Sequence, residues 1–171
     1  MPSEVADRPE GLAIGDYIEV RVAGSPEVKY YKILNRDPIM FVNVHSALSA
    51  GATETYTEIS DLDPPDGEIY QIYAILVRGN VKVYIKQPPA VDRFGTNRSP
   101  TGGYLTDRIS PVSSGKIINL WITKNNAPSV QIENPTNVTI TPKLYWFGWK
   151  YKVEEVKYKP EIYTPIIIGW G

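Results

Sequence analysis

The stretch that decides the fold spans residues 69–86 and reads IYQIYAILVRGNVKVYIK. Its first half, residues 69–77, is an almost continuous apolar run, which is typical of a β-strand that is buried on both faces. In residues 81–86 apolar and polar side chains alternate, and this period of two indicates a strand with one face in the core and the other in water. Arg78-Gly79-Asn80 separates the halves and predicts a tight hairpin between them.

The same two patterns recur along the rest of the chain. The 15 prolines and 13 glycines interrupt it too often for long helices, and only residues 44–50 are a candidate for a short helix. Residues 87–103 are polar and broken, which predicts a surface loop. The predicted strands are 16–22, 28–34, 39–44, 53–59, 68–77, 80–86, 102–106, 116–123, 128–132, 137–147 and 149–158. So many short strands predict an all-β protein, a single jelly-roll-like β-sandwich or barrel with extended terminal arms.

The two ends of the chain differ from its middle. Residues 1–12 are polar and lack a periodic pattern, which predicts an N-terminal arm before a sandwich domain over residues 13–159. Residues 160–171 are rich in apolar side chains and predict a C-terminal arm. An apolar arm must be covered, either by the chain's own sheet or by another chain. The candidate assembly interface is therefore Ile162, Tyr163, Ile166, Ile167, Ile168 and Trp170.

Composition and charge exclude several classes of function. The chain has no cysteine, so disulfide scaffolds, thiolate metal sites and cysteine nucleophiles are excluded together. Its formal charge of −1 provides no general attraction for nucleic acid, and we expect no nucleic-acid partner. The polar, acidic N-terminus lacks the features of a signal peptide, and no apolar run approaches the ~18 residues of a transmembrane segment. We expect synthesis in a cytoplasm without a signal peptide.

No combination of residues predicts catalysis. His45 is the only histidine, and a nucleophilic triad needs a histidine with placed partners, so a structural role is the simpler interpretation. Asp61, Asp63 and Asp66 are the best candidates for a metal site, because calcium prefers closely spaced carboxylates. Prolines between them break the spacing of an EF-hand loop, which favours a solvated turn. We therefore expect no metal, no cofactor and no enzymatic activity.

The densest aromatic stretch lies near the C-terminal end of the predicted domain. Trp146, Trp149 and Tyr151 are interleaved with lysines and are candidates for a platform on which sugar rings or single-stranded nucleic acid stack. Alternation alone also explains them, as core tryptophans beside an exposed lysine face. Sequence leaves both interpretations open.

Charge is segregated along the chain. Residues 37–77 contain seven acids and neither lysine nor arginine, whereas lysines outnumber acids in residues 143–159. If the fold places these strips on opposite sides, neighbouring copies of the chain would meet acid to base in a ring or lattice. The alternative is two unrelated solvated faces.

A cysteine-free β-sandwich of this size, with arms at both ends and strands rich in tyrosine, proline and isoleucine, resembles a viral jelly-roll subunit. More narrowly, residues 17–158, with the strands in 69–85 and 117–149, resemble the smaller major capsid protein of tailless, membrane-containing icosahedral phages of thermophilic bacteria, the vertical single β-barrel lineage. The resemblance implies a structural protein of the virion. Its barrels would build a shell with a second, larger capsid protein over a lipid vesicle, through lateral and arm-mediated contacts.

A second function remains open from the residues. A carbohydrate- or receptor-binding β-sandwich, such as a spike or fibre head, would use Trp146, Trp149 and Tyr151 or the 87–103 loop as its contact surface.

Overall fold

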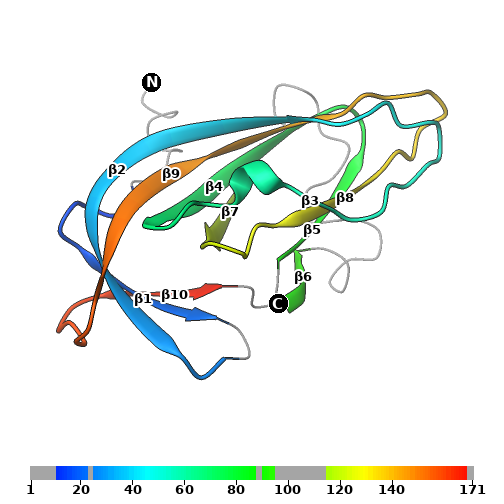
Figure 1. Ribbon diagram of the computed structural model, residues 1–171. Helices are drawn as coiled ribbons and strands as arrows, with labels where there is room; N and C mark the ends of the chain where they lie inside the picture. The colour runs from blue at the N-terminus through cyan, green and yellow to red at the C-terminus, as the bar shows by residue number, and fades with distance from the viewer. Residues whose placement is uncertain (1–10, 23–24, 88–89, 95–114, 169–171) are drawn as a thin grey trace.

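The computed structural model describes residues 11–22, 25–87, 90–94 and 115–168, and these residues form an all-β sandwich (Figure 1), as predicted. In this part of the chain there are ten strands and one turn of 3-10 helix, Ser60–Leu62. The strands are β1 (Tyr17–Val22), β2 (Val28–Val44), β3 (Thr57–Glu58), β4 (Glu68–Arg78), β5 (Lys82–Gln87), β6 (Ala90–Phe94), β7 (Gly115–Ile122), β8 (Ser129–Glu133), β9 (Lys143–Val156) and β10 (Thr164–Ile168).

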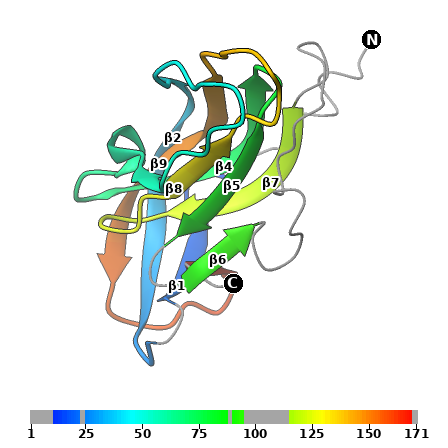
Figure 2. The same cartoon turned by 90° about the vertical axis from the view of Figure 1, so that its right-hand side faces the viewer.

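The strands form two sheets, which lie one over the other (Figure 2). The six-stranded sheet has the order β10-β1-β2-β9-β4-β7, and the four-stranded sheet has the order β3-β8-β5-β6. All pairs are antiparallel except β1 and β10, which run parallel. The sequence did not predict this parallel pair, because β10 comes from residues expected to form an arm.

Two long strands, β2 and β9, form the spine of the six-stranded sheet and arch over the molecule (Figure 1). They pair from Tyr30–Val156 to Val44–Lys143, where the sequence predicts two shorter strands in each place. In β9 the predicted break lies at Gly148, which is instead an interior strand position opposite a bulge in β4 between Ile72 and Ala74. A side chain there would clash with the carbonyl oxygen of Gln71, so the glycine permits the close approach of β4 and β9.

In β2 the predicted break lies around Pro38, which is also inside the strand. β1 pairs with β2 up to Lys32, and Gly15 and Asp16 exchange backbone hydrogen bonds with Ile33, but beyond Ile33 no strand among the described residues pairs with this edge of β2. A proline is tolerated on such an edge because its missing N–H removes no ladder hydrogen bond.

The predicted hairpin at Arg78-Gly79-Asn80 is wrong. β4 and β5 belong to different sheets, so this turn is a corner that carries the chain from one layer to the other. Gly79 has a φ of +111°, which favours glycine, and a side chain there would press against Ile140. Two strong consecutive strand patterns indicate a turn between them, but they do not tell whether the strands pair.

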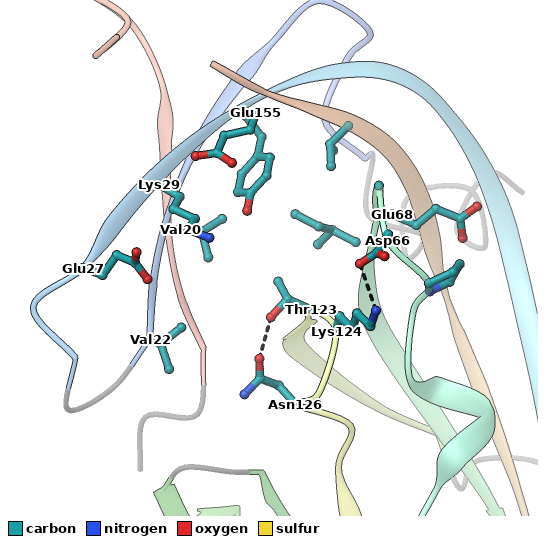
Figure 3. Close-up of a pocket in the computed structure, with 15 residues that line it drawn as sticks. Val20, Val22, Glu27, Lys29, Asp66, Glu68, Thr123, Lys124, Asn126 and Glu155 are labelled. Carbon is teal, nitrogen blue, oxygen red and sulfur yellow. Dashed lines mark hydrogen bonds and ion pairs between the residues drawn. The ribbon is translucent and has the colours of Figure 1, made fainter. Parts of the chain in front are cut away.

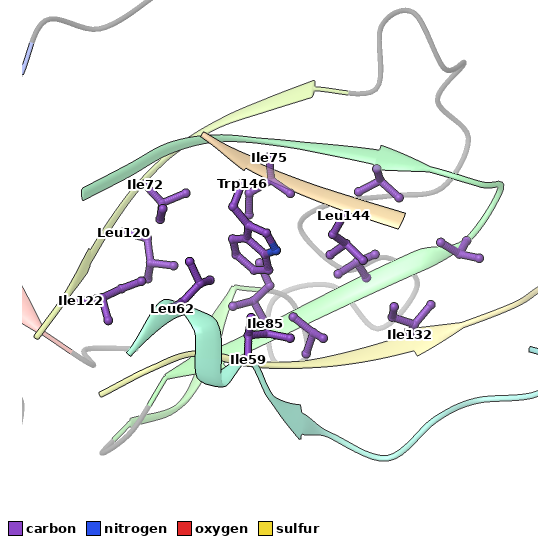
Figure 4. Close-up of a cluster of buried hydrophobic side chains, with 14 of the residues drawn as sticks. Ile59, Leu62, Ile72, Ile75, Ile85, Leu120, Ile122, Ile132, Leu144 and Trp146 are labelled. Carbon is purple, nitrogen blue, oxygen red and sulfur yellow. The ribbon is translucent and has the colours of Figure 1, made fainter. Parts of the chain in front are cut away.

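Two hydrophobic clusters lie on opposite faces of the six-stranded sheet. The first fills the space between the two sheets around Trp146, Ile72 and Leu120 (Figure 4). The second contains Tyr151, Trp121 and side chains of β1 and β10. The consecutive residues Trp121 and Ile122 belong to different clusters, and alternation along a strand places them on opposite faces.

The second cluster forms because the six-stranded sheet curls. Trp121 of β7 and Ile166 of β10 belong to the two edge strands of the sheet, yet both lie in this cluster. Leu12 packs against the same cluster, and its backbone N–H donates to the Tyr151 hydroxyl at 2.8 Å. Leu12, near the beginning of the described chain, and β10, at its end, therefore both contribute to the second cluster.

The terminal segments differ from the predicted arms. Thr164–Ile168 is strand β10 of the sheet, so this part of the predicted C-terminal arm, and with it the boundary at 159/160, is corrected. Of the predicted N-terminal arm only residues 11 and 12 are described, and they lie against the curl.

Several other local predictions also change. The candidate helix at 44–50 does not form, because Leu48 exchanges two backbone hydrogen bonds with Ile140. The predicted 53–59 strand is reduced to Thr57–Glu58, and the predicted 87–103 loop contains β6. The predicted strand at 102–106 lies outside the described residues.

Candidate functional site

One half of the six-stranded sheet packs over the four-stranded sheet. The opposite face of this half, which points away from the four-stranded sheet, is also apolar. In register across β2, β9 and β4 lie the rows Met40–Phe147–Ala74 and Val42–Tyr145–Leu76. Together with Val44 at the end of β2, these residues make a set of seven that is called the outer apolar face. Their sequence neighbours Phe41, Trp146 and Ile75 belong to the core between the sheets, so alternation turns the outer apolar face away from that core.

This face is open to solvent along β2. The side chains of Met40, Val42 and Val44 are 56%, 42% and 58% exposed, whereas those on β9 and β4 are partly buried by their neighbours. Single exposed apolar residues are ordinary, but a contiguous set in register on three strands is typical of an interaction surface.

Cations lie at both ends of the outer apolar face. The Arg78 guanidinium lies 5.8 Å from the centre of the Tyr145 ring, and Lys143 is exposed between Val44 and Arg78 in the next row. At the other end, Arg36 lies 4.9 Å from the centre of the Trp149 ring. The result is an apolar centre with aromatic side chains and positive charges at both ends, the composition of a protein interface.

A cleft of about 470 Å³ lies at the mouth of the curled half (Figure 3). Its floor is apolar and consists of Val20, Val22, Ile69 and Val153, with Tyr31 at one side. Its rim is polar and carries charges of both signs. The rim residues are Glu27, Lys29, Asp66, Glu68, Thr123, Lys124, Asn126 and Glu155.

A buried carboxylate, Glu19, lies on the outer side of the β1–β2 pair. It accepts hydrogen bonds from Arg21 Nε at 3.0 Å and from the Tyr30 hydroxyl at 3.1 Å. The hydrogen bond from Arg21 lowers the pKa of Glu19, against the opposing effect of burial. The Tyr30 ring packs against Tyr163, which ties the segment between β9 and β10 to this polar cluster. These contacts hold the segment between β9 and β10, which is called the crossover, against β1 and β2.

The structure places two of the three predicted platform residues in the interior. Trp146 and Tyr151 are fully buried, so neither can stack on a sugar or a base, and this part of the alternative contact surface is wrong. Tyr151 stacks on Trp121 and donates a hydrogen bond to Gln71 Oε1 at 2.7 Å, and burial raises its pKa. Trp149 is partly exposed beside Arg36. The simpler interpretation therefore accounts for the aromatic stretch: alternation along the strand places aromatic side chains in the core.

The carboxylates considered for a metal site do not face one another as a ligand set. Asp63 accepts a hydrogen bond from the backbone N–H of Asn125 at 2.7 Å, and Asp66 forms an ion pair with Lys124 at 3.0 Å. Asp61 lies in the exposed 3-10 turn. Within the described parts of the chain, no three His, Cys, Asp or Glu side chains form a group that could hold a metal ion. The two paired aspartates fasten the β3–β4 turn to the β7–β8 turn.

The single histidine is in the interior of the protein. The His45 side chain is 8% exposed, and its Nδ1 lies 3.1 Å from Glu54 Oε1. This pair joins the end of β2 to the segment before β3. A lone histidine held by one carboxylate in this way has the geometry of a structural contact.

The residues predicted as an assembly interface separate into two groups. Ile166 and Ile168 are buried within the chain's own sheet, which corrects their assignment to an interface. Ile167 and Ile162 are 46% and 84% exposed, and Tyr163 is partly buried. Trp170 lies outside the described residues. Of the two alternatives for the apolar tail, the chain's own sheet covers Ile166 and Ile168, whereas Thr164, Pro165 and Ile167 remain exposed.

The acidic and basic strips are not separated on opposite sides of the sandwich. Asp37 pairs in register with Lys150, and Glu68 pairs with Lys152, so members of both strips are cross-strand neighbours. A contact between copies that relies on separate acidic and basic sides is therefore not supported at these positions.

Sequence reasoning missed both the outer apolar face and the cleft. The alternating residues Met40, Val42 and Val44 were a signal for the first, since they make one face of a strand apolar while Ile39 and Phe41 fill the other. The cleft had no such signal, because its lining comes from five separate segments of the sequence.

Among the described residues, no helix is long and apolar enough to cross a membrane. Comparisons of the chain with known protein families, with curated proteins and with solved structures found no match.

Proposed function

We propose that the chain is a structural protein of a virion, a capsid subunit that builds a shell through lateral contacts of its outer apolar face. The observation that carries this proposal is the set of apolar side chains in register on β2, β9 and β4, of which those on β2 are exposed. Burial of such a face stabilises an association, and the cations at both its ends select partners with acidic groups there and fix the orientation.

The proposal assigns the main contact to the sheet rather than to the C-terminal segment. Ile166 and Ile168 already stabilise the chain's own fold, so they are not available to a neighbour. The exposed Ile162 and Ile167 are left for secondary, arm-like contacts. Partners are further copies of the chain and a second shell protein, as the resemblance to capsid subunits implies.

The binding of carbohydrates through the aromatic strip is not retained, because Trp146 and Tyr151 are buried. No observation at that strip favours it over a structural role.

The test compares valines of nearly equal exposure. Val44 and Val138 are 58% and 57% exposed, but only Val44 belongs to the outer apolar face. We expect the double variant Val42→Lys/Val44→Lys to lose self-association or co-assembly, because each buried valine contributes roughly 1.5–3 kcal/mol and tenfold in affinity needs about 1.4 kcal/mol. Val138→Lys serves as the matched control and should assemble as the wild type does.

Sedimentation velocity and negative-stain images of the purified protein measure assembly, and circular dichroism verifies that each variant is folded. The proposal fails if the wild type stays monomeric under assembly conditions, alone and with candidate shell proteins. It also fails if the double variant assembles like the wild type.

A further inference from the structure

We propose that the cleft at the mouth of the curled sheet is a binding site for an amino sugar. This site is independent of the shell proposal, since none of its lining residues belongs to the outer apolar face. Its volume of about 470 Å³ is in the range of small-molecule sites, roughly 300–1,000 Å³.

The floor of the cleft suits the apolar side of a sugar ring. Val20, Val22, Ile69 and Val153 supply aliphatic surface, and they are contiguous with the buried cluster of the curl, which keeps them in place. Tyr31 lines the same space and packs against that cluster, so it offers an aromatic side chain for ring contacts.

The rim offers hydrogen-bond donors and acceptors. On the side of β1 and β2, Glu27 and Lys29 project toward the cleft (Figure 3), and neither side chain forms a hydrogen bond or ion pair with another described residue. Polar groups on the opposite side are held by local pairs, Thr123 Oγ1 to Asn126 Oδ1 at 2.6 Å and Lys124 to Asp66 at 3.0 Å. A polyhydroxylated ligand can satisfy such a mixed set, whereas a purely apolar ligand would leave it unpaired.

The charges of the rim decide between kinds of sugar. On the side of β1 and β2 the cleft is lined by the carboxylates of Glu27 and Glu155 and the ammonium group of Lys29, with Lys157 3.3 Å from Glu155. On the other side Asp66 is paired with Lys124, and Glu68 points away from the cleft (Figure 3). Burial raises the pKa of Tyr31, and the nearby carboxylates of Glu155 and Glu27 raise it further, which indicates a negative potential at the tyrosine hydroxyl. A ligand ammonium placed between these carboxylates gains charge-assisted hydrogen bonds, while an acidic sugar is repelled.

The test is a titration of the full chain with three sugars that differ in charge: glucosamine, glucose and glucuronate. We expect backbone amide resonances of Val20–Val22, Lys29 and Gly67 to shift saturably with glucosamine. Glucosamine should bind at least fivefold more tightly than glucose, glucuronate should bind most weakly, and the differences should shrink in high salt.

Two variants and one matched control complete the experiment. Glu27→Gln removes a carboxylate of the rim and Tyr31→Leu removes the aromatic ring, and each should weaken glucosamine binding severalfold, whereas Glu161→Gln, at an exposed acid outside the cleft, should not. The proposal is overturned if glucosamine gives no saturable shift, if it binds no more tightly than glucose, or if Glu27→Gln binds it as the wild type does.

Discussion

The two halves of strand β9 carry apolar side chains on the same face of the sheet, but only one half is covered. Every second residue from Tyr145 to Val153 lies on this face, because β9 itself has no bulge. Tyr151 and Val153 are buried under the curl formed with β1 and β10, whereas Tyr145 and Phe147 belong to the outer apolar face. The same pattern therefore stabilises the fold at one end and is left for other contacts at the other.

The difference shows what alternation along a strand can and cannot tell. It identifies which side chains share a face, but whether that face is covered depends on segments far away in the sequence. In this chain β1 and β10 cover the curled half, and among the described residues no strand covers the face of Met40 and Val42. An uncovered apolar face in a folded domain is the property that a subunit of an assembly requires.

The largest expected difference in the free energy of unfolding is between variants of the adjacent residues Trp146 and Phe147, which point to opposite faces of the sheet. Trp146 is fully buried between the sheets, so Trp146→Ala should lower the free energy of unfolding by about 3–5 kcal/mol. Phe147 lies on the outer apolar face and is partly exposed, so Phe147→Ala should cost about 1 kcal/mol. Urea denaturation followed by fluorescence and circular dichroism measures both. Equal losses would mean that the outer face is covered as well as the core.

A second pair tests how β10 is covered. Ile166 is 2% exposed and its neighbour Ile167 is 46% exposed. Ile166→Ala should cost about 2–4 kcal/mol of unfolding free energy, because it leaves a cavity in the cluster of the curl. Ile167→Ala should stay within about 0.5 kcal/mol of the wild type. If Ile166→Ala leaves stability unchanged while assembly is lost, the C-terminal segment is an interface and not a strand of the chain's own sheet.

The class of fold could be predicted because it depends on local patterns. The apolar run at 69–77 and the alternation at 81–86 predict strands at the positions of β4 and β5. Their pairing could not be predicted, since the turn at Gly79 is compatible with a hairpin and with a corner between sheets. Breaks in the strands were predicted at Gly148 and around Pro38 for the same reason. Gly148 is tolerated inside β9 because β4 has a bulge opposite it, and Pro38 is tolerated inside β2 because β1 does not extend that far. Neither feature can be read from the local sequence.

The candidate sites were harder to predict. The aromatic strip was visible in the sequence, but the burial of Trp146 and Tyr151 depends on the second sheet and on the curl. For the C-terminal segment, sequence gave two alternatives, and only the parallel pairing with β1 distinguishes them. The cleft gathers Val20, Lys29, Asp66 and Asn126 from segments with no common pattern, so no local signal existed.

The smallest expected effect concerns the pH dependence of stability at the covered end of the sheet. The hydrogen bond from Arg21 lowers the pKa of Glu19 below its usual value of 4.5. The ionised carboxylate therefore contributes stability that is present above this value and is lost as the pH falls through the lowered pKa of the folded state. The contribution is small because Arg21 is 54% exposed and solvent screens the pair.

We expect the urea midpoint of the wild type to fall more between about pH 6 and about pH 3 than that of Glu19→Gln, which cannot ionise at this position. Both proteins share all other carboxylates, so the difference between the two pH profiles isolates Glu19. Tyr30→Phe removes the second hydrogen bond to the carboxylate, and its profile should lie between the other two. Parallel profiles for wild type and Glu19→Gln would show that the carboxylate holds no ionic contact that matters to the fold. The crossover between β9 and β10 would then be held by the ring contacts of Tyr30 with Tyr163 and of Tyr17 with Tyr158.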